Sequence, residues 1–419
     1  MSDLAKFLSQ QRENYLEAVK NGKGKDWTVV MGNEAGDLDS LASATAFAWY
    51  RSAIENLPSV PLSQTLRGDL HLRAENLHAM QLAGLDPSNP PILCIDDIPS
   101  ASPFPSNTFA LVDHNRLLPQ FSRDNPDTKV VAIVDHHEDE GYHKETAEPR
   151  IVKSPIGSAS SLVARFLQSH CADRLPPELA IFLLSAILVD TAGLQPGGKA
   201  GEDDRAIVPY LLSRANFASG SLTGDSELHF IPELQDLTST LLAKKGEVSH
   251  FNTRDLLRRD YKEYSLVPSI QPEKTILVGL ATVPVGLKTW IHRVGEEDFW
   301  TSTQKYIQDR DLTALGILTS FRDSDHPTKK HHEGKHRREQ LFLVREGVVE
   351  GLADKLFDGL KHAKTLDLKK RNLSEDYGTK KSWVREGLTV RVWEQGNAHA
   401  TRKVTAPLVK NIIEGTTEG

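Results

Sequence analysis

Three short apolar segments that each end in aspartate constrain the fold more than any other feature of the sequence. They are "PILCID" (91–96), "TFALVD" (108–113) and "KVVAIVD" (129–135). Uninterrupted apolar runs of this length are typical of strands that are covered on both faces, as in a parallel sheet. In open α/β folds the carboxyl ends of such strands border the ligand crevice. The aspartates are therefore expected to lie at the edge of a binding site.

Helical patterns alternate with these strands through the first half of the chain. "WTVVM" (27–31) is a further predicted strand, and helices are expected over 40–57, 72–85, 157–170 and 177–190. Alternation of this kind predicts an α/β fold with a doubly wound parallel sheet. In the second half, strands are expected at 274–285 and 340–347, and helices around 290–309 and 350–362.

A chain of 419 residues is long enough for two domains. Residues 214–233 are rich in serine, glycine and polar residues, which is typical of a linker. We expect an N-terminal catalytic domain at 1–213, a linker with a connecting helix at 214–245, and a smaller α/β substrate-binding domain at 246–419. The active site is expected in the cleft between them.

Composition excludes several classes of protein. The two cysteines, Cys94 and Cys171, cannot form a disulfide framework or a thiolate zinc site. The longest apolar run, "AIFLLSAILV", has ten residues and is too short to span a membrane. The first twenty residues do not resemble a signal or transit peptide, because acids lie among their bases. We therefore expect a cytoplasmic protein without a membrane association.

The net charge of −7 is unevenly distributed, with −12 over residues 1–250 and +5 over residues 251–419. An acidic half could hold cations and a basic half an anionic substrate. Chance variation between the surfaces of two domains would also give such a difference.

Oxygen ligands gather at four separate places in the first half. Asn33, Glu34, Asp37 and Asp39 lie in one loop that leads into a helix. One aspartate there could simply cap the helix, but the whole group suits Mg²⁺ or Mn²⁺ better. The other three places are the endings "VDHN", "IVDHH" and "LVDT", which contribute Asp113, His136 and Asp190.

Carboxylates with one or two imidazoles and no thiolate favour Mg²⁺ or Mn²⁺ over structural zinc. The set contains more carboxylates than one ion needs, so two divalent cations about 3.5–4 Å apart are expected. Such a pair can activate a water molecule and neutralise the charge of a phosphoryl group.

"GDLDS", "VDHN", "VDHH" and "LVDT", in this order, resemble the four motifs of the DHH phosphoesterase superfamily. The second half is similar to the DHH-associated domain of family II inorganic pyrophosphatases, cytosolic exopolyphosphatases and prune-like proteins. The segments that carry this likeness are "LLRRDYKEY", "GKHRREQLFLV" and "QGNAHATRKVTAPLV". In detail, the chain most resembles the fungal exopolyphosphatases.

The resemblance implies a role for each matching residue of the first half. One metal would be bound by Asp37, the other by Asp39, and Asp113 would bridge both. The remaining metal ligands would be His136 and Asp190. These five residues, with the substrate-facing His137, form the implied catalytic set, which Asp135 and His114 would support from behind.

Asn33 departs from the related pyrophosphatases, which have a metal-binding histidine at this position. An amide oxygen is a harder ligand than imidazole, so the preference should move from Mn²⁺ towards Mg²⁺. The departure favours the exopolyphosphatase branch, and Asn33 is counted among the candidate substrate-binding residues.

Basic residues of the second half are expected to bind the phosphate chain. By resemblance, Arg402 and Lys403 correspond to a pair that grips phosphate. The stretch 329–338 holds five Lys or Arg and three His. It is either a solvated loop, a nuclear address or a cationic wall of the cleft, to which His331, His332, Lys335, His336, Arg337 and Arg338 would contribute. Ser158, with the amides at its helix start, could be an anion site or only a cap.

The function expected from these residues is exopolyphosphatase activity, in which a hydroxide activated by two metals removes terminal orthophosphate from linear polyphosphate. Pyrophosphate or a short oligophosphate is the alternative substrate. A prune-like binding protein with weak phosphodiesterase activity is the alternative of another class. Nucleic acid is not expected as a substrate, because the glycine-rich C-terminal motif of the related exonucleases is absent. No obligate protein partner is evident.

Overall fold

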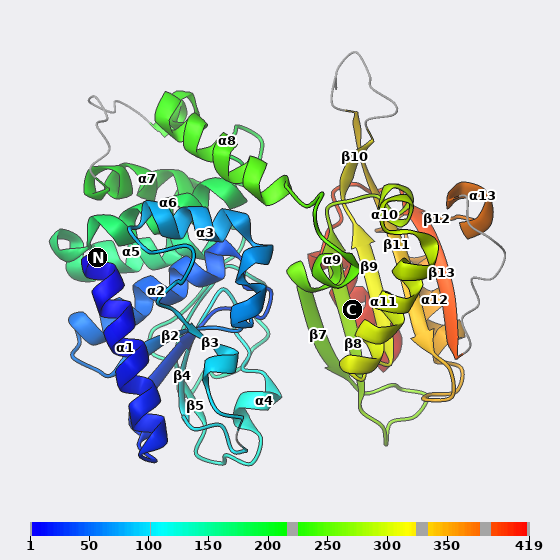
Figure 1. Ribbon diagram of the computed structural model, residues 1–419, viewed down its shortest axis with the longest axis horizontal. Coiled ribbons are helices and arrows are strands. Elements are labelled where there is room, and N and C mark those ends of the chain that lie inside the picture. Colours follow the sequence, from blue (N-terminus) through cyan, green and yellow to red (C-terminus); the bar gives the residue numbers. More distant parts are fainter. Residues whose placement is uncertain (1, 101, 216–224, 324–333, 378–386, 417–419) are drawn as a thin grey trace. The chain divides into compact units, whose positions relative to one another are not determined.

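The structure is a computed structural model, and it describes residues 2–100, 102–215, 225–323, 334–377 and 387–416. The chain divides into two compact units, Met1–Glu247 and Val248–Gly419 (Figure 1). Each unit has its own sheet. The N-terminal unit has a parallel sheet covered by helices, which confirms the predicted α/β class, and the C-terminal unit is a mixed α/β structure.

The sheet of the first unit has the strand order β3-β2-β1-β4-β5-β6, and every pairing is parallel. This order reverses direction between β1 and β4, which is where doubly wound folds bind their ligands. The strands are β1 (Thr28–Met31), β2 (Ser59–Ser63), β3 (Leu93–Cys94), β4 (Thr108–Val112), β5 (Lys129–Asp135) and β6 (Arg150–Val152).

Alternate residues of these strands face two different hydrophobic cores, as the two-residue period of a strand requires. In β4, Ala110 and Val112 belong to one core, and Phe109 and Leu111 belong to the other. The helices of this unit are α1 (Asp3–Lys20), α2 (Leu38–Ala53), α3 (Ala74–Leu82), α4 (Pro119–Ser122), α5 (Ala159–Cys171), α6 (Pro177–Asp190), α7 (Glu202–Arg214) and α8 (Pro232–Gly246).

Helix α6 is the most apolar of these helices, and eleven of its residues, Leu179–Val189, are buried without interruption. It packs against α2, α5, α7 and α8, so its last residue, Asp190, is carried on a rigid support. The predicted linker region contains α8, which packs on α3 and α6 within the first unit. None of the described helices is long and apolar enough to cross a membrane.

The second unit has a mixed sheet of seven strands in the order β12-β13-β11-β9-β8-β7, with β10 paired to β11. Among the described strands of the second unit, β8 and β9 form the single parallel pair. The strands are β7 (Tyr261–Leu266), β8 (Ile276–Val283), β9 (Ala314–Thr319), β10 (Phe321–Asp323), β11 (Lys335–Arg345), β12 (Leu368–Lys370) and β13 (Leu388–Gln395). The helices are α9 (Thr253–Arg259), α10 (Leu287–Val294), α11 (Glu296–Asp309), α12 (Leu352–His362), α13 (Leu373–Tyr377) and α14 (Arg402–Glu414).

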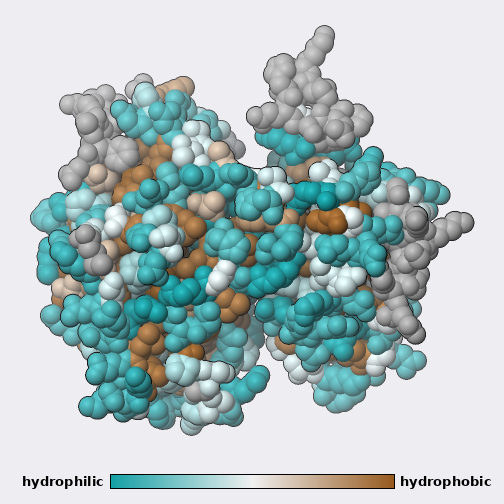
Figure 2. Space-filling view, viewed as in Figure 1, coloured by the Kyte–Doolittle hydropathy of each residue, from teal (hydrophilic) through white to brown (hydrophobic). Residues whose placement is uncertain are grey.

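A hydrophobic core joins one face of this sheet to α12 and α14, with Phe342, Trp393, Leu356 and Val409 among its buried members. Figure 2 shows that hydrophilic residues cover most of the face in view, and that hydrophobic residues are exposed there only in smaller areas among them.

Candidate metal and phosphate site

The loop after β1 brings the first group of polar residues to the reversal point of the sheet. Asp37 caps α2, because its Oδ1 accepts a hydrogen bond of 3.0 Å from the backbone N–H of Ser40. Asn33 is buried, and its side-chain oxygen accepts from the N–H of Ala35 at 2.9 Å. The capping interpretation of Asp37 is therefore correct for one of its oxygens, while Asn33 shapes the loop.

Asp113 follows β4 and is buried with 2% of its surface exposed. Its φ of 59° lies in the left-handed region, which aspartate and asparagine adopt more readily than most residues. Its Oδ2 accepts from Ser40 Oγ at 2.6 Å and from Asn33 Nδ2 at 2.7 Å. Asn33 thus orients the carboxylate of Asp113 through its amide nitrogen.

His136 and His137 follow β5 and are held in different ways. The Nδ1 of His136 lies 3.0 Å from the carbonyl oxygen of Ile156, which can only accept, so Nδ1 carries the proton. The Nε2 of His136 faces Asp113 Oδ1 at 3.3 Å, and in the neutral ring this nitrogen carries the lone pair that can bind a metal ion. A histidine fixed in this manner is oriented to bind a metal ion.

The Nδ1 of His137 lies 2.8 Å from Oδ1 of Asp135 and 3.6 Å from Oδ1 of Asp113. Asp135 is fully buried and also accepts from Asn115 at 2.6 Å. The hydrogen bond from His137 outweighs burial and lowers the pKa of Asp135 well below its usual range. Asp135 therefore orients His137, whose ring stays partly exposed.

Asp113, His136 and His137 each offer one ligand atom, and these three atoms lie within 4.8 Å of one another. Burial, with the nearby charges of Asp37 and Asp39, raises the pKa of Asp113 to about 8. The carboxylates therefore gather in a space that favours protons or cations.

Asp39 lies beside this cluster, with its Oδ2 4.0 Å from Nε2 of His136. Its carboxylate also accepts from the start of α5, where the donors are Ser158 Oγ, Ala159 N and Ser160 N at 2.6–2.7 Å. The anion bound at this helix start is thus a side chain of the protein itself. Sequence reasoning had considered an outside anion there.

Asp190 ends α6, and burial raises its pKa to about 7 although 22% of the side chain remains exposed. Charges of Asp39 and Asp37 add to this shift. The ammonium of Lys245 on α8 lies 3.7 Å away and opposes it. The sequence analysis did not identify Lys245, because nothing in a surface lysine of a helix indicates its partner.

His114, the second predicted supporting residue, directs its Nδ1 to the carbonyl oxygen of Val112 at 2.9 Å. It is half-buried beside Asp113 in the chain. The six carboxylate and imidazole residues of the predicted catalytic set thus lie at the start of α2, directly after β4 and β5, and at the end of α6.

The donor set suits a divalent cation such as Mg²⁺ or Mn²⁺. It consists of carboxylate oxygens and an imidazole nitrogen with a fixed lone pair, without a thiolate. Cations would also offset the burial and the repulsion between carboxylates, which together raise the pKa values of Asp113 and Asp190.

In the second unit, the basic stretch begins outside the described residues, where the predicted residues His331 and His332 lie. From Lys335 the chain is strand β11, so successive side chains point to opposite faces of the sheet. Lys335 and Arg337 share one face, while His336 and Arg338 share the other. These cations therefore form two groups and not one row.

The two arginines of β11 also differ in their contacts. Arg337 Nη1 lies 3.3 Å from a carboxylate oxygen of Glu394. Arg338 donates from Nε to the carbonyl oxygen of Ala398 at 2.7 Å, and burial lowers the pKa of its guanidinium. The pKa of His336 is lowered by burial and by the charges of neighbours that include Arg338 and His399.

Arg402 is the first residue of α14 and binds Asp260, with Nη2 2.7 Å from Oδ1 and Nη1 2.8 Å from the carbonyl oxygen. Lys403 beside it is exposed. Arg402 thus fixes the start of α14 to the segment before β7. The N–H groups at a helix start attract anions as well.

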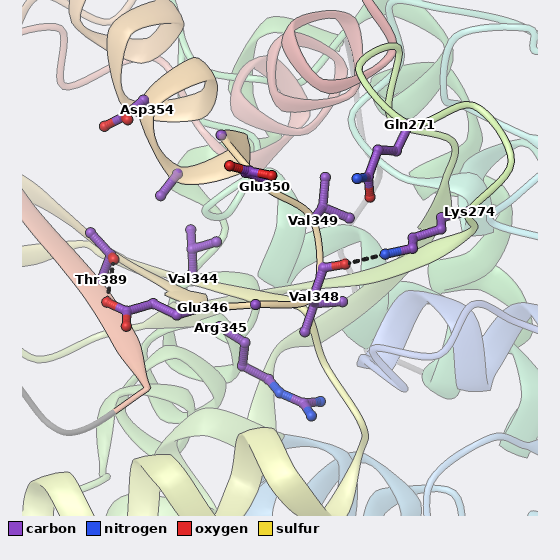
Figure 3. Close-up of a pocket in the computed structure, with 13 residues that line it drawn as sticks. Gln271, Lys274, Val344, Arg345, Glu346, Val348, Val349, Glu350, Asp354 and Thr389 are labelled. Atoms are coloured by element: carbon purple, nitrogen blue, oxygen red, sulfur yellow. Dashed lines mark hydrogen bonds between the residues drawn. The ribbon is translucent and has the colours of Figure 1, made fainter.

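A separate pocket of about 460 Å³ lies at the C-terminal end of β11, near Arg345 (Figure 3). Its polar groups bind one another, since Lys274 donates to the carbonyl oxygen of Val348 and Thr389 donates to Glu346. Arg345 in its wall is ten residues beyond Lys335, or roughly 30 Å along a strand. We therefore do not include this pocket in the phosphate site.

Comparisons with known proteins give two family matches. Residues 27–187 match the N-terminal domain of the DHH family, and residues 239–412 match the DHHA2 domain. A Schizosaccharomyces pombe protein described as "putative exopolyphosphatase" is 29% identical over 98% of both chains. The mouse exopolyphosphatase PRUNE1 is 26% identical over 74% of this chain and 63% of its own length.

Among solved structures, a Methanococcus jannaschii protein described as a putative family II inorganic pyrophosphatase superposes with a TM-score of 0.56. The match covers 93% of this chain and all of that chain at 18% identity. It supports the fold alone. It confirms the predicted pair of α/β domains.

Proposed function

Because this chain belongs to the DHH family and carries a DHHA2 domain after its N-terminal DHH domain, we propose that it is an exopolyphosphatase. The proposed reaction releases the terminal orthophosphate from linear inorganic polyphosphate. The coarser activity, hydrolysis of a phosphoanhydride bond, follows from the relatives and the fold. Two buried thiols, Cys94 and Cys171, fit the cytoplasmic location that we also propose.

The observation that carries the proposal is the cluster of Asp113, His136 and His137 at the reversal point of the sheet. Two divalent ions, Mg²⁺ or Mn²⁺, would supply positive charge for the phosphate and lower the pKa of a water molecule. The residues proposed to hold them are those predicted from the sequence: Asp37, Asp39, Asp113, His136 and Asp190.

Each protein group of the proposed site has a physical task that its contacts support. Asn33 and Ser40 fix one oxygen of Asp113, which leaves Oδ1 facing His136. We propose that His137 donates a hydrogen bond to the phosphate at the reacting end. Its Nδ1–H on Asp135 stabilises the positive charge that this donation favours.

We propose that cations of the second unit bind the phosphates behind the reacting end. The candidates are Arg338, Arg402 and Lys403, because an Arg fork matches phosphate geometry and an exposed Lys adds charge, together with His336, whose lowered pKa makes it a neutral hydrogen-bond donor. Lys335 and Arg337 on the other face of β11 are weaker candidates. Arg337 also pairs with the carboxylate of Glu394, which it shares with Arg371.

Hydrolysis of pyrophosphate or a short oligophosphate is the second candidate function. The alternation of β11 favours it, since fewer cations than expected share one face along which a long chain could lie.

Phosphate release from pyrophosphate, tripolyphosphate and long polyphosphate tests the proposal, with Mg²⁺ and Mn²⁺ compared at equal concentration. An exopolyphosphatase should release orthophosphate from long chains at the highest kcat/KM, and should need a divalent ion. Faster turnover of pyrophosphate than of either longer chain would support the second candidate instead. No release from any of the three substrates would contradict both.

A further inference from the structure

The 156–161 turn, which leads into α5 and includes its first three residues, holds two of the proposed metal ligands. The carbonyl oxygen of Ile156 accepts from Nδ1 of His136, and this contact fixes the proton on that nitrogen. Ser158, Ala159 and Ser160 donate three hydrogen bonds to Asp39. The position of this one turn therefore sets the orientation of His136 and Asp39 together.

Asp204 on α7 holds this turn through its carboxylate. Its Oδ2 accepts from the backbone N–H of Gly157 at 2.8 Å and of Gly201 at 2.7 Å, and its Oδ1 accepts from Ser161 Oγ at 2.6 Å. The side chain is fully buried. Two of these three short hydrogen bonds come from the turn, and together they leave it little freedom to move.

Gly157 shows how closely the turn lies against its supports. A Cβ built at this residue would lie 2.6 Å from Thr191 Cγ2 and 2.9 Å from Oδ2 of Asp204. A side chain at position 157 would therefore push the turn away from α7 and from the residue that follows Asp190. The backbone must approach Asp204 directly for its N–H to bond there.

We propose that Asp204 is a positioning residue of the metal site, which acts by holding the 156–161 turn so that Asp39 and His136 point towards one ion. This inference rests on the proposed function, because it presupposes that the cluster binds divalent cations. Residues of this kind, which bind the ligands' own partners, commonly change metal affinity by about 10–100-fold when removed.

The test measures Mn²⁺ binding to the full metal-free chain. Isothermal titration calorimetry and the electron paramagnetic resonance signal of free Mn²⁺ report the affinity. Asp204→Ala should bind Mn²⁺ at least about tenfold more weakly than the wild type. Ser161→Ala removes one of the three contacts and should weaken binding by about fivefold, as one hydrogen bond predicts.

Two variants serve as controls. Asp203→Ala removes the same charge from the adjacent residue of α7, where the carboxylate pairs with the exposed cations Lys153 and Arg165. It should change Mn²⁺ affinity by less than about twofold. Asp204→Asn should retain an Mn²⁺ affinity within about threefold of the wild type. The side-chain oxygen of the asparagine can accept from the N–H groups of Gly157 and Gly201, and its amide can donate to Ser161 Oγ.

Urea unfolding of each metal-free variant separates positioning from general stability. A merely structural role would lower the unfolding midpoint of Asp204→Ala and leave the Mn²⁺ affinity of the folded protein unchanged, which would overturn the proposal. If Asp204→Ala does not fold, wild-type affinity of Ser161→Ala overturns it equally. Absence of Mn²⁺ binding by the wild type would instead overturn the proposed function, so the two failures are distinguishable.

Discussion

Replacement of Asp113 by asparagine should stabilise the metal-free protein, although it should abolish the activity. Asparagine fits the site, because it tolerates the left-handed φ of 59°. Its oxygen can accept from Asn33 and Ser40 as the carboxylate does. Its amide can donate to Nε2 of His136, which carries a lone pair.

The magnitude follows from the pKa of Asp113, which burial and two neighbouring carboxylates raise to about 8. An aspartate of the unfolded chain titrates near 3.9, so between these values the folded state binds a proton that the unfolded state lacks. Stability contributed by this group is therefore complete below about pH 4 and is lost as the pH rises towards 8. At pH 7 the difference of about 3 pH units corresponds to up to about 4 kcal/mol.

Asp113→Asn removes this titration, so its advantage over the wild type should be absent at pH 4 and should grow to as much as about 4 kcal/mol at pH 7. Urea unfolding in a chelator at pH 4, 5.5 and 7 measures it. Saturating Mn²⁺, at about 100 times its dissociation constant, should then stabilise the wild type by about 2.7 kcal/mol and leave the variant unchanged.

Asp97→Asn is the matched control with the opposite sign. Hydrogen bonds from Arg67 and Arg12 lower the pKa of Asp97, so its stabilising contribution is present at pH 7 and is lost in acid. This variant should be less stable than the wild type at pH 7. If Asp113→Asn is no more stable than the wild type at pH 7 without metal, or if its advantage is the same at pH 4, the reasoning is refuted.

Three further predictions concern metal choice and substrate binding. Asn33→His introduces an imidazole beside Asp113 and should raise the affinity for Mn²⁺ relative to Mg²⁺; an unchanged ratio in metal titrations would place residue 33 outside the metal's reach. Arg338→Gln should raise KM for long polyphosphate more than for tripolyphosphate, and less so at high salt. Arg337→Gln should have a smaller effect, because its side chain lies on the other face of β11 and pairs with Glu394. Arg402→Ala should lower kcat on every chain length and destabilise the protein by about 1.5–3 kcal/mol, through the lost charged hydrogen bonds to the Asp260 segment; a loss confined to long chains would contradict its place at the reacting end.

The strands that the sequence predicted are those with uninterrupted apolar residues, and β4 and β5 agree closely with the expected segments. Strand β2 was not identified, since Pro61 interrupts "SVPLS" and proline normally argues against a central strand. Strand β6 has only three half-buried residues and carries no recognisable pattern. These elements exist because their neighbours supply the pairing, which a local pattern cannot reveal.

The acidic ends of β4 and β5 were predictable for a similar reason: the order of a parallel sheet brings successive carboxyl ends together. The contacts of Asp39 were not, because its donors lie about 120 residues away on α5. One of the interpretations open for the basic stretch is a single cationic wall, yet most of its described part is a strand. Its period of two separates Arg337 from Arg338.

Three features of the protein compensate so many carboxylates in one place. The raised pKa of Asp113 favours its protonated form when no cation is bound, the ammonium of Lys245 lies near Asp190, and the start of α5 donates to Asp39. Each compensation is weaker than a divalent ion at the same place, because none brings two full charges within bonding distance. Cations that bind there must displace the protons, so metal affinity should rise with pH between about 6 and 8. The orientation of Asp113 by Asn33 and Ser40, and of His136 by Ile156, does not depend on those protons, so the ligands need little rearrangement when an ion binds.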